Sequence, residues 1–276
     1  MSRPEHIAPA EIFYNEEEAK KYSTNSRMSF IQQEMTERAI ELMNLNGRTN
    51  LHILDLGCGS GFSGTTLEMN GQLYTGMDIS FDMLKIAKES NGSVVQGDMG
   101  GYLPFRPNTF DGCISISAIQ WLCQSDKRSQ NPLSRLRKLF ESLFGCMKRG
   151  SRCVFQLYPE SHFDLEMITN AAAKAGFTGG VVVDFPNSKK AKKYYIVLMC
   201  GEQKGGMPMA KGVDVVDEEE TSIKVDKKKF KNETKPRKIK TKSREWILNK
   251  KQKQREKGLD VRPDTKYTGR KRSRGF

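Results

Sequence analysis

From residue 51 to residue 158, short apolar runs alternate with segments whose apolar residues recur at helical spacing. The runs are rich in Val, Ile, Leu and Phe, which is typical of buried strands. They lie at residues 51–56, 72–78, 93–98, 110–117 and 151–158. Residues 80–90 and 132–147 show the helical spacing, and the second segment opens on a proline, which suits a first helical turn. This alternation predicts a parallel sheet covered by helices on both faces.

The pattern changes after a further helical segment at residues 161–177. Two apolar runs, 180–185 and 193–200, follow each other with only a loop between them. Because this loop leaves no room for a crossover helix, we expect the two strands to pair antiparallel. The sequence therefore predicts an α/β fold with a seven-stranded, mostly parallel sheet that ends in an antiparallel hairpin.

Upstream of the first strand, residues 26–45 place apolar side chains on one helical face. The residues of this face are Met28, Ile31, Met35, Ala39, Ile40 and Met43. We expect this helix to pack on the sheet. The domain boundaries predicted from these patterns are an N-terminal segment and helix at 1–50, an α/β domain at 51–202, and a C-terminal tail at 203–276.

Charge is distributed unevenly along the chain. Residues 1–200 contain 22 Lys and Arg against 21 Asp and Glu, whereas residues 201–276 contain 24 against 12. Because the C-terminal segment has few large apolar residues, we expect a basic, largely disordered tail that contacts nucleic acid or another acidic partner. Alternatively, the tail only improves solubility. Within it, residues 243–257 are predicted to form a helix, with Ser243 as its cap and Gly258 as its stop.

Cysteine usage and the N-terminus bear on the compartment. The six cysteines form no C-x-x-C pair and lie mostly inside apolar runs, which is typical of reduced core residues. The N-terminus lacks the basic start and apolar core of a signal peptide, and no apolar run approaches the length of a membrane span. We expect a soluble protein of the cytosol or nucleus, without a membrane partner.

The stretch "DLGCGSG", residues 55–61, follows the first predicted strand and allows two interpretations. Gly59, Gly61 and Gly64 have the glycine spacing of a dinucleotide-binding turn. Gly57, Gly59 and Gly61, with an aspartate just ahead of them, instead fit a turn that holds a ligand without a pyrophosphate. In both cases a glycine turn lets backbone approach a ligand at the start of a helix.

Three aspartates at strand ends favour S-adenosylmethionine as the ligand. Asp78 is placed to accept hydrogen bonds from ribose hydroxyls, which suits NAD and S-adenosylmethionine equally, and Asp98 is placed to accept one from the adenine amine. Asp55 favours a ligand that carries positive charge, as the sulfonium and ammonium of S-adenosylmethionine do, and disfavours phosphates. Gly64 is then expected to be a packing glycine. Alternatively, Asp55 caps the next helix and Asp98 opens a turn.

The chain resembles the eukaryotic 18S rRNA (guanine-N7)-methyltransferases of the bud-site-selection or Williams-Beuren type, which have the class I methyltransferase fold. The matching stretches are "RPEHIAPAEIFYNEEEAKKYSTNSRM", "DLGCGSG", "SISAIQWLC", "VVVDFPNSKKAKKYYIVL", "REWILNKKQKQREKG" and "DTKYTGRKRSRGF". The glycine stretch is common to many methyltransferases, whereas the N-terminal block, the lysine-rich stretch and the end of the tail are specific. The resemblance covers nearly the whole chain except the acidic stretch at residues 213–226.

The resemblance implies methyl transfer from S-adenosylmethionine to N7 of a guanine in 18S rRNA. That nitrogen has a free lone pair, so the reaction needs no general base, and the protein mainly has to align the reactants and exclude water. The chain offers little acid–base chemistry, since it has only three histidines, none beside the expected site. This counts against hydrolase or dehydrogenase chemistry. The resemblance further implies a role as an assembly factor of the small ribosomal subunit.

Site residues are assigned on this basis. Gln120 is expected to bond a base edge, and Trp121 to stack on a guanine turned out of its helix. Alternatively, Trp121 is a core anchor under the substrate loop. The residues assigned to the cofactor are Asp55, Gly57, Gly59, Gly61, Asp78, Ile79, Asp98, Met99, Ser115, Tyr14, Tyr22 and Arg27, the last three closing over the donor from the N-terminal segment. No metal ligands are expected.

Partners are predicted from charge and from the resemblance. Lys189, Lys190, Lys192 and Lys193 lie in the loop between the last two strands and are expected to contact phosphates of small-subunit pre-rRNA, unless this is only a solvated turn. The resemblance implies a small zinc-ribbon activator subunit that forms a heterodimer with the chain. Val94 and Val95 lie on a predicted edge strand, which invites β-addition, so we expect this subunit there.

Clustered lysines and arginines in the tail suit nuclear import. We therefore expect the protein in the nucleus, both nucleolus and nucleoplasm, and in the cytoplasm. Two other interpretations remain open at this point. The chain methylates a small molecule or a protein, or its methyltransferase fold serves mainly as a platform for ribosome assembly.

Overall fold

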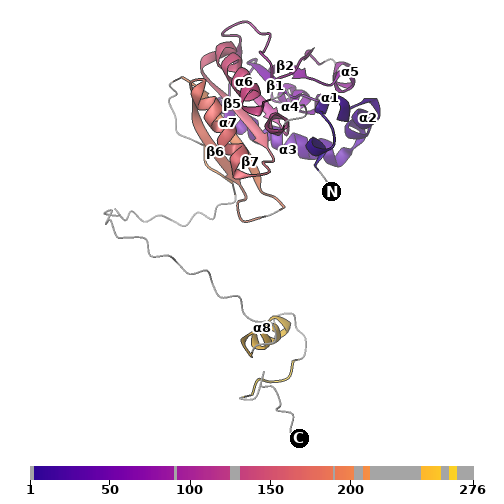
Figure 1. Cartoon of the computed structure of the whole chain (residues 1–276), viewed down its shortest axis with the longest axis vertical. Coiled ribbons are helices and arrows are strands. Elements are labelled where there is room, and N and C mark those ends of the chain that lie inside the picture. Colours follow the sequence, from indigo (N-terminus) through magenta and orange to yellow (C-terminus); the bar gives the residue numbers. More distant parts are fainter. Residues whose placement is uncertain are drawn as a thin grey trace, which may run out of the picture. The chain divides into compact units, whose positions relative to one another are not determined.

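The computed structural model describes residues 3–89, 92–124, 131–188, 190–201, 208–211, 244–255 and 261–265. The chain divides into two compact units, Met1–Val216 and Asp217–Phe276. The first unit holds the sheet and its helices (Figure 1). In the second unit the structure describes the helix α8, Arg244–Arg255, and residues 261–265. This helix falls within the predicted range, whereas Ser243 and Gly258, predicted to cap and stop it, lie outside the described residues.

The first unit contains the predicted seven-stranded sheet. Its strands are β1 His52–Leu56, β2 Leu73–Asp78, β3 Val94–Gln96, β4 Phe110–Ile116, β5 Met147–Leu157, β6 Phe177–Asp184 and β7 Lys193–Cys200. Their order across the sheet is β3-β2-β1-β4-β5-β7-β6. Neighbours from β3 to β5 are parallel, and β7 is antiparallel to both β5 and β6. The predicted fold class is therefore confirmed, including the antiparallel hairpin.

Helices connect the strands and precede the first of them. The longer helices are α3 Ser26–Met43, α4 Phe62–Met69, α5 Phe81–Glu89, α6 Pro132–Cys146 and α7 His162–Lys174. Polar caps define where several begin: the Asn25 side chain accepts from Met28 N at the start of α3, and Ser161 and Asp164 form a reciprocal capping box at α7. Pro132 occupies the first turn of α6, as its position in the sequence predicts.

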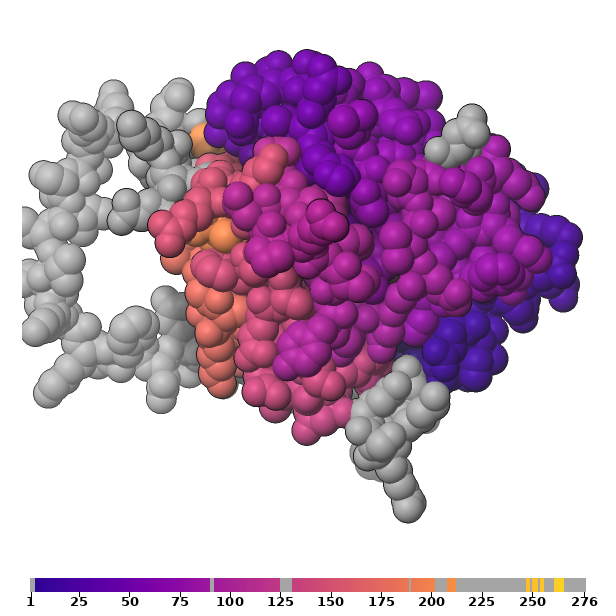
Figure 2. Space-filling model, turned by 90° about the horizontal axis from the view of Figure 1, so that it is seen from above, coloured from indigo at the N-terminus to yellow at the C-terminus, as the bar shows by residue number. Residues whose placement is uncertain are grey.

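Short helices that the apolar pattern does not predict form the N-terminal segment and the turn after β4. They are η1 Pro4–His6, α1 Ala10–Phe13, α2 Glu16–Thr24 and η2 Ile119–Cys123. The segment from η1 to α2 packs beside α5, and the space-filling view shows its indigo residues against purple residues of the domain (Figure 2). Elements this short have too few turns for an apolar periodicity to emerge.

Two apolar clusters fill the two faces of the sheet. One joins α6 and α7 to the strands and includes Phe140, Phe155 and Ile168, which are fully buried. The other joins α3 and α4 to the opposite face, through residues such as Leu42 and Leu67. The six cysteines are free, and all except Cys123 are buried, as expected of reduced core residues. In the part of the chain that the structure describes, no helix is long and apolar enough for a membrane span.

The carboxyl ends of the parallel strands lie along one edge of the sheet, called here the carboxyl edge. Because β7 is antiparallel to β5 and β6 is antiparallel to β7, the start of β7 and the end of β6 reach the same edge. Arg38 of α3 makes a bidentate ion pair there with the buried Asp184 at the end of β6, with Nε–Oδ2 2.8 Å and Nη2–Oδ1 3.1 Å. Asp184 also accepts from Lys211 N at 2.7 Å, so residues 208–211 return to this edge.

Candidate active site

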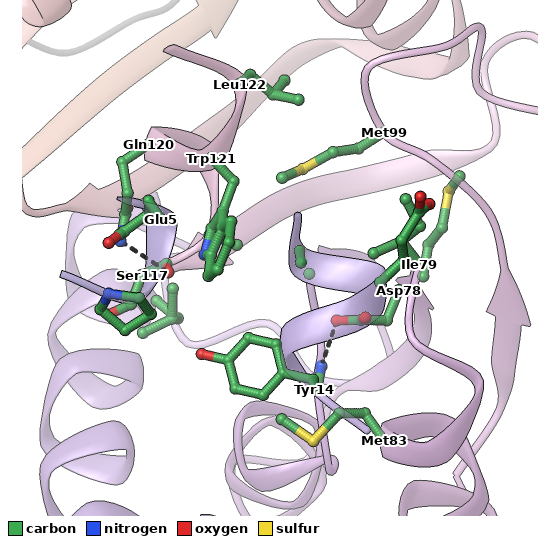
Figure 3. Close-up of a pocket in the computed structure, with 18 of the residues that line it drawn as sticks. Glu5, Tyr14, Asp78, Ile79, Met83, Met99, Ser117, Gln120, Trp121 and Leu122 are labelled. Atoms are coloured by element: carbon green, nitrogen blue, oxygen red, sulfur yellow. Dashed lines mark hydrogen bonds between the residues drawn. The ribbon is translucent and has the colours of Figure 1, made fainter. Parts of the chain in front are cut away.

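A cavity of about 370 Å³ opens at the carboxyl edge of the sheet, beside the ends of β1, β2 and β4. Its walls come from the glycine loop, the ends of β2 and β4, the turn η2, the helix α3 and the N-terminal segment. The volume is that of a site for a small organic ligand. Figure 3 shows how the side chains of these separate segments converge on it.

Gly57 and Gly59 line the cavity, and both have positive φ angles, of 75° and 53°. Gly57 N donates to Met77 O at 2.7 Å, which holds the loop against the neighbouring strand β2. A Cβ atom at Gly57 would clash with Ala118. These two glycines therefore let backbone form the floor of the cavity.

Gly61 and Gly64 pack against other elements and do not line the cavity. Gly61 has φ 92° at the start of α4, where a Cβ would press on Ala87 of α5 at 3.3 Å. A Cβ at Gly64 would clash with the ring of Tyr74, as expected of a packing glycine. The assignment of Gly61 to ligand contact thus needs correction, because it shapes the helix start and does not face the ligand.

Asp78 lies at the end of β2 and turns its carboxylate into the cavity (Figure 3). Its Oδ2 accepts from Gly59 N at 2.9 Å and its Oδ1 from Ser80 N at 2.8 Å. Burial raises the pKa of Asp78, and the backbone N–H donors oppose that shift. Ile79 lines the cavity beside it. The arrangement leaves carboxylate lone pairs that ribose hydroxyls can satisfy.

Asp55 does not reach the cavity. It is completely buried at the end of β1 and accepts a 2.5 Å hydrogen bond from Ser63 Oγ in the first turn of α4. Burial raises the pKa of Asp55 to about 7, partly offset by the Ser63 bond. The expectation that Asp55 faces the positive charge of the donor is corrected accordingly: its carboxyl fastens α4 to β1 beneath the glycine loop.

Asp98 and Met99, after β3, line the cavity, as predicted. Asp98 Oδ1 accepts from Gly100 N at 2.8 Å and from Arg135 Nη2 of α6 at 2.9 Å. Asp98 therefore opens a turn and also lines the cavity, and its bond to the adenine amine stays a prediction. Arg135, which sequence reasoning missed, shares the carboxylate with any ligand bound there.

Ser115 and Arg27, assigned to the cofactor, lie away from the cavity. Ser115 is fully buried within β4, where it pairs with Phe155 of β5. Arg27 is exposed in the first turn of α3. Both assignments are corrected: the strand continues past Ser115, and the residues that reach the cavity are Ile116, Ser117 and Ala118.

Tyr14 and Tyr22 of the N-terminal segment line the cavity with their rings 6.0 Å apart. The Tyr14 carbonyl accepts from Ser80 Oγ at 2.7 Å, which ties this segment to the start of α5. Burial, followed by the charge of Glu5, raises the pKa of Tyr14 to about 12, so its hydroxyl stays protonated near neutral pH. The two tyrosines thus form a neutral aromatic wall.

Gln120 and Trp121 lie on η2 just after β4, each 8 % exposed and each lining the cavity. The Trp121 ring centroid is 5.9 Å from that of Tyr14. Ser117 just ahead has φ 57°, a left-handed conformation uncommon for a side chain with a Cβ and frequent at functional sites. The turn at Ser117 points η2, and with it Trp121, at the cavity.

The lysine-rich loop meets the cavity wall through Tyr158, which lines the cavity at the end of β5. Lys193 Nζ donates to Tyr158 Oη at 3.0 Å, and Lys192 Nζ lies 5.9 Å from the ring centroid of Tyr194. Lys190 is exposed to solvent. Lys189 lies outside the described residues.

Val94 and Val95 belong to β3, which is the edge strand at one end of the sheet. Val94 is half-buried and Val95 is 37 % exposed. Their placement on an edge strand agrees with the sequence interpretation. Among the described residues, no cluster of His, Cys, Asp and Glu side chains is suited to bind a metal ion.

The residues present fit S-adenosylmethionine. The cavity is of suitable size, Asp78 offers an acceptor for ribose hydroxyls, and Tyr14, Met83 and Met99 supply apolar and aromatic surface for adenine and sulfur. Met83, Arg135 and Tyr158 also line the cavity and lie outside the matching stretches, so sequence reasoning did not find them. Glu5 and Ser117 line it too and lie within matching stretches, but sequence reasoning gave them no role. They come from segments far apart in the chain, and only folding brings them together.

Comparisons with known proteins identify the family of the chain. Residues 54–155 match a methyltransferase domain, and residues 198–274 match a family described as methyltransferase involved in Williams-Beuren syndrome. The chain is 49% identical to an 18S rRNA (guanine-N(7))-methyltransferase of Mus musculus, over 99% of this chain and 98% of the relative. It is 43% identical to the 18S rRNA (guanine(1575)-N(7))-methyltransferase of Saccharomyces cerevisiae, over 100% of both.

Solved structures share the fold. A putative S-adenosyl-L-methionine-dependent methyltransferase of Methanococcus maripaludis superposes with a TM-score of 0.53 at 17% identity, covering 69% of this chain and 95% of that one. A phosphoethanolamine N-methyltransferase of Haemonchus contortus in complex with S-adenosyl-L-methionine gives 0.51 at 17% identity, over 73% and 61%.

Proposed function

The chain belongs to the 18S rRNA (guanine-N7)-methyltransferase family, and on that premise we propose that its cavity brings S-adenosylmethionine and a guanine of 18S rRNA together for methyl transfer to N7. It is an S-adenosylmethionine-dependent enzyme. The observation that carries the assignment of the site is that Asp78 and Trp121 face one cavity from two strand ends. One residue binds the donor and the other receives the base.

The residues of the cavity suit a reaction that needs no proton transfer before the methyl moves. When bound, S-adenosylmethionine supplies a methyl group on a positively charged sulfur, and N7 of guanine offers a free lone pair. Among the described residues that line the cavity, none is a histidine. Asp78 and the loop of Gly57 and Gly59 hold the donor, Trp121 and Tyr14 exclude water, and η2 orients the base.

The target guanine has to leave its stack to enter a cavity enclosed by several segments of the chain. Trp121 and Tyr14 offer aromatic faces that replace the lost stacking. Lys190 and Lys192 of the loop and Lys193 at the start of β7 are proposed to bind phosphates that flank the target; the start of β7 at the carboxyl edge supports this. The basic segment after residue 216 adds sequence-independent RNA affinity.

A zinc-ribbon activator subunit is proposed as the protein partner, at β3. The backbone of this strand has one neighbour, β2, so its other side is free to pair with an added strand. Val95 is exposed there. A partner that covers this edge would also keep the chain from aggregating. A function on pre-rRNA favours a location in the nucleolus, nucleoplasm and cytoplasm, and the basic clusters of the tail suit nuclear import.

A second candidate role is that of an assembly platform for the small subunit, in which presence of the protein matters and methylation does not. The size and charge of the basic segment favour it. Methylation of a small molecule or a protein is less consistent with that segment. The platform role and the enzymatic role are compatible in one protein.

The function is tested by methyl transfer from radiolabelled S-adenosylmethionine to small-subunit precursor particles, with the chain co-expressed with the zinc-ribbon subunit. We expect label at one guanine, detected by cleavage at 7-methylguanine, and loss of it in Asp78→Ala. Asp82→Ala, on α5 outside the cavity, is the matched control and should retain labelling.

The Asp78→Ala variant also separates the enzymatic role from the platform role. Rescue of ribosome maturation in cells by Asp78→Ala, without methylation, would establish a platform role. Absence of label with the unsubstituted chain, although the folded heterodimer binds the donor, would refute rRNA as the acceptor.

A further inference from the structure

The end of the cavity away from Asp78 carries two side chains with free oxygen acceptors, Glu5 and Gln120. In Figure 3, both lie on the side of Trp121 opposite Asp78 and Ile79. Both line the same cavity as Asp78. Asp78, which suits the ribose of the donor, lies at the other end. The partner of these two acceptors is therefore either the acceptor base or the ammonium of the donor, and the measurement of donor affinity below separates the two.

The orientation of the Gln120 amide is fixed by Ser117. Gln120 Nε2 lies 3.0 Å from Ser117 O, and only the NH₂ end of an amide can donate to a carbonyl. Oε1 therefore points away from the Ser117 carbonyl. Gln120 is buried, with 8 % of its surface exposed, and its Oε1 has no hydrogen-bond partner among the described residues. A buried acceptor without a partner is costly and calls for a donor from a ligand.

Glu5 is held in place by the residues on both sides of it. Arg3 donates to Tyr158 O at 2.8 Å and to Pro159 O at 3.2 Å, just after β5. His6 contacts Glu160 Oε2 at 3.1 Å, and Gln124, at the end of η2, donates to the same oxygen. The turn η1 is thus fastened to the same loop as η2, which carries Gln120.

The carboxylate of Glu5 is free to bind a ligand. Within the described residues it makes neither a hydrogen bond nor an ion pair. A carboxylate is an acceptor with two oxygens and pairs best with two parallel N–H donors.

Guanine is the RNA base whose Watson–Crick edge matches these acceptors. It presents N1–H and a 2-amino group side by side, whereas adenine has an acceptor at N1 and no amino group at position 2. N7 lies on the opposite side of the purine. A guanine with its Watson–Crick edge at Glu5 therefore turns N7 toward Asp78 and the donor side of the cavity.

We propose that Glu5 and Gln120 select guanine: the Glu5 carboxylate accepts from N1–H and from one hydrogen of the 2-amino group, and Gln120 Oε1 accepts from the other. Trp121 and Tyr14 then contact the faces of the ring. This inference rests on the proposed function, and it assigns the base specificity of the reaction to η1 together with η2, so that Glu5 contributes to it from outside the methyltransferase domain match at residues 54–155.

The test compares the co-expressed heterodimer with its Glu5→Gln variant, and uses Glu17→Gln, an exposed residue of α2, as the matched control. Three quantities are measured: kcat/KM on small-subunit precursor particles, donor affinity by calorimetry, and binding of free guanosine, inosine and adenosine monophosphates by saturation-transfer NMR with S-adenosylhomocysteine present. Inosine lacks only the 2-amino group of guanine.

We expect Glu5→Gln to lower kcat/KM by about tenfold or more and to leave donor affinity unchanged. The unsubstituted enzyme should prefer the guanosine nucleotide over the inosine nucleotide, and Glu5→Gln should abolish that preference. Glu17→Gln should behave as the unsubstituted enzyme in all three measurements.

Three results would overturn the inference. The first is an unchanged kcat/KM in Glu5→Gln. The second is a loss of donor affinity in Glu5→Gln, which would place Glu5 on the donor. The third is a preference for the guanosine nucleotide that the unsubstituted enzyme lacks or that Glu5→Gln retains. Failure of the proposed function would look different, because the unsubstituted enzyme would then bind the donor without labelling rRNA.

Discussion

At the scale of single residues, the glycine loop depends most on Gly57. Its φ of 75° is a conformation that residues with a Cβ adopt at a cost of about 1–2 kcal/mol. Its missing side chain also leaves room for Ala118, next to η2. The backbones of Gly57 and Ala118 approach closely and so join the glycine loop to η2, which carries Trp121. A substitution at Gly57 therefore affects both the donor side and the acceptor side of the cavity.

We predict that Gly57→Ala abolishes donor binding and destabilises the protein more than Gly47→Ala does. Gly47 has φ 73° but nothing within 4 Å of an added Cβ, so the two substitutions share the backbone cost and differ in the clash. Urea unfolding and calorimetry with S-adenosylmethionine measure the two effects. Equal destabilisation by both variants, with donor binding retained in Gly57→Ala, would contradict this account.

Sequence reasoning identified some residues of the site and misplaced others for a physical reason. Asp55 and Asp78 look alike in the sequence, since each ends a predicted strand. In the fold, Asp78 turns outward to the backbone N–H groups of Gly59 and Ser80, whereas Asp55 is closed in by Ser63 of α4. Which way a carboxylate turns depends on the helix packed over it, and that packing has no local signal.

At the scale of elements, the two edge strands of the sheet differ in what they join. β3 has three residues and ends next to the cavity, at the turn with Asp98 and Met99. β6 has eight residues and is tied at its end to α3 by the ion pair of Asp184 and Arg38. A partner strand paired with β3 would therefore fix the position of the turn with Asp98 and Met99, which line the donor site. This suits an activating subunit.

We predict that Val95→Lys weakens the heterodimer by at least about tenfold, because a lysine at this place would put a charge into an apolar contact. Val181→Lys on β6 is the control, since Val181 is 38 % exposed and Val95 is 37 % exposed, on opposite edges of the sheet. Isothermal calorimetry with the zinc-ribbon subunit measures both. A weaker complex with Val181→Lys and an unchanged one with Val95→Lys would move the interface to β6.

Apolar runs predicted all seven strands and their pairing sense, but not every boundary. β5 begins at Met147, directly after α6, whereas the apolar run begins later, because its first residues include Lys148, Arg149 and Gly150. β6 likewise begins at Phe177, within the predicted range of the preceding helix. Backbone hydrogen bonds extend a strand into polar residues, and the apolar pattern of the sequence does not predict these residues as part of the strand.

At the scale of the whole molecule, the boundary between structured and basic parts is anchored at a defined place. Residues 208–211 are fixed to the carboxyl edge: Arg38 Nη2 donates to Met209 O at 2.8 Å, and Lys211 contacts both Asp184 and Glu41. Residues 217–276, which follow, hold 22 Lys and Arg against 10 Asp and Glu. Residues 217–276 thus follow the anchored stretch in the sequence and carry most of the excess positive charge of the chain.

We predict that a chain ending at Val216 folds and binds S-adenosylmethionine as the full chain does, but binds small-subunit precursor particles at least about tenfold more weakly near physiological salt. The reason is that phosphate contacts of the basic segment release counterions. Filter binding at several salt concentrations should show a shallower dependence on salt for the shortened chain. An unchanged affinity and salt dependence would assign RNA binding to the first unit alone.

The fastening of the N-terminal segment has a consequence for the order of events in catalysis. Arg3 and the Tyr14 carbonyl hold this segment across the donor cavity, and Glu5 on the same segment faces the acceptor end. We predict that this segment opens to admit the donor before RNA binds, so that turnover is ordered, with the donor first and the RNA second. Product-inhibition kinetics with S-adenosylhomocysteine measure the order, and a random order would contradict the prediction.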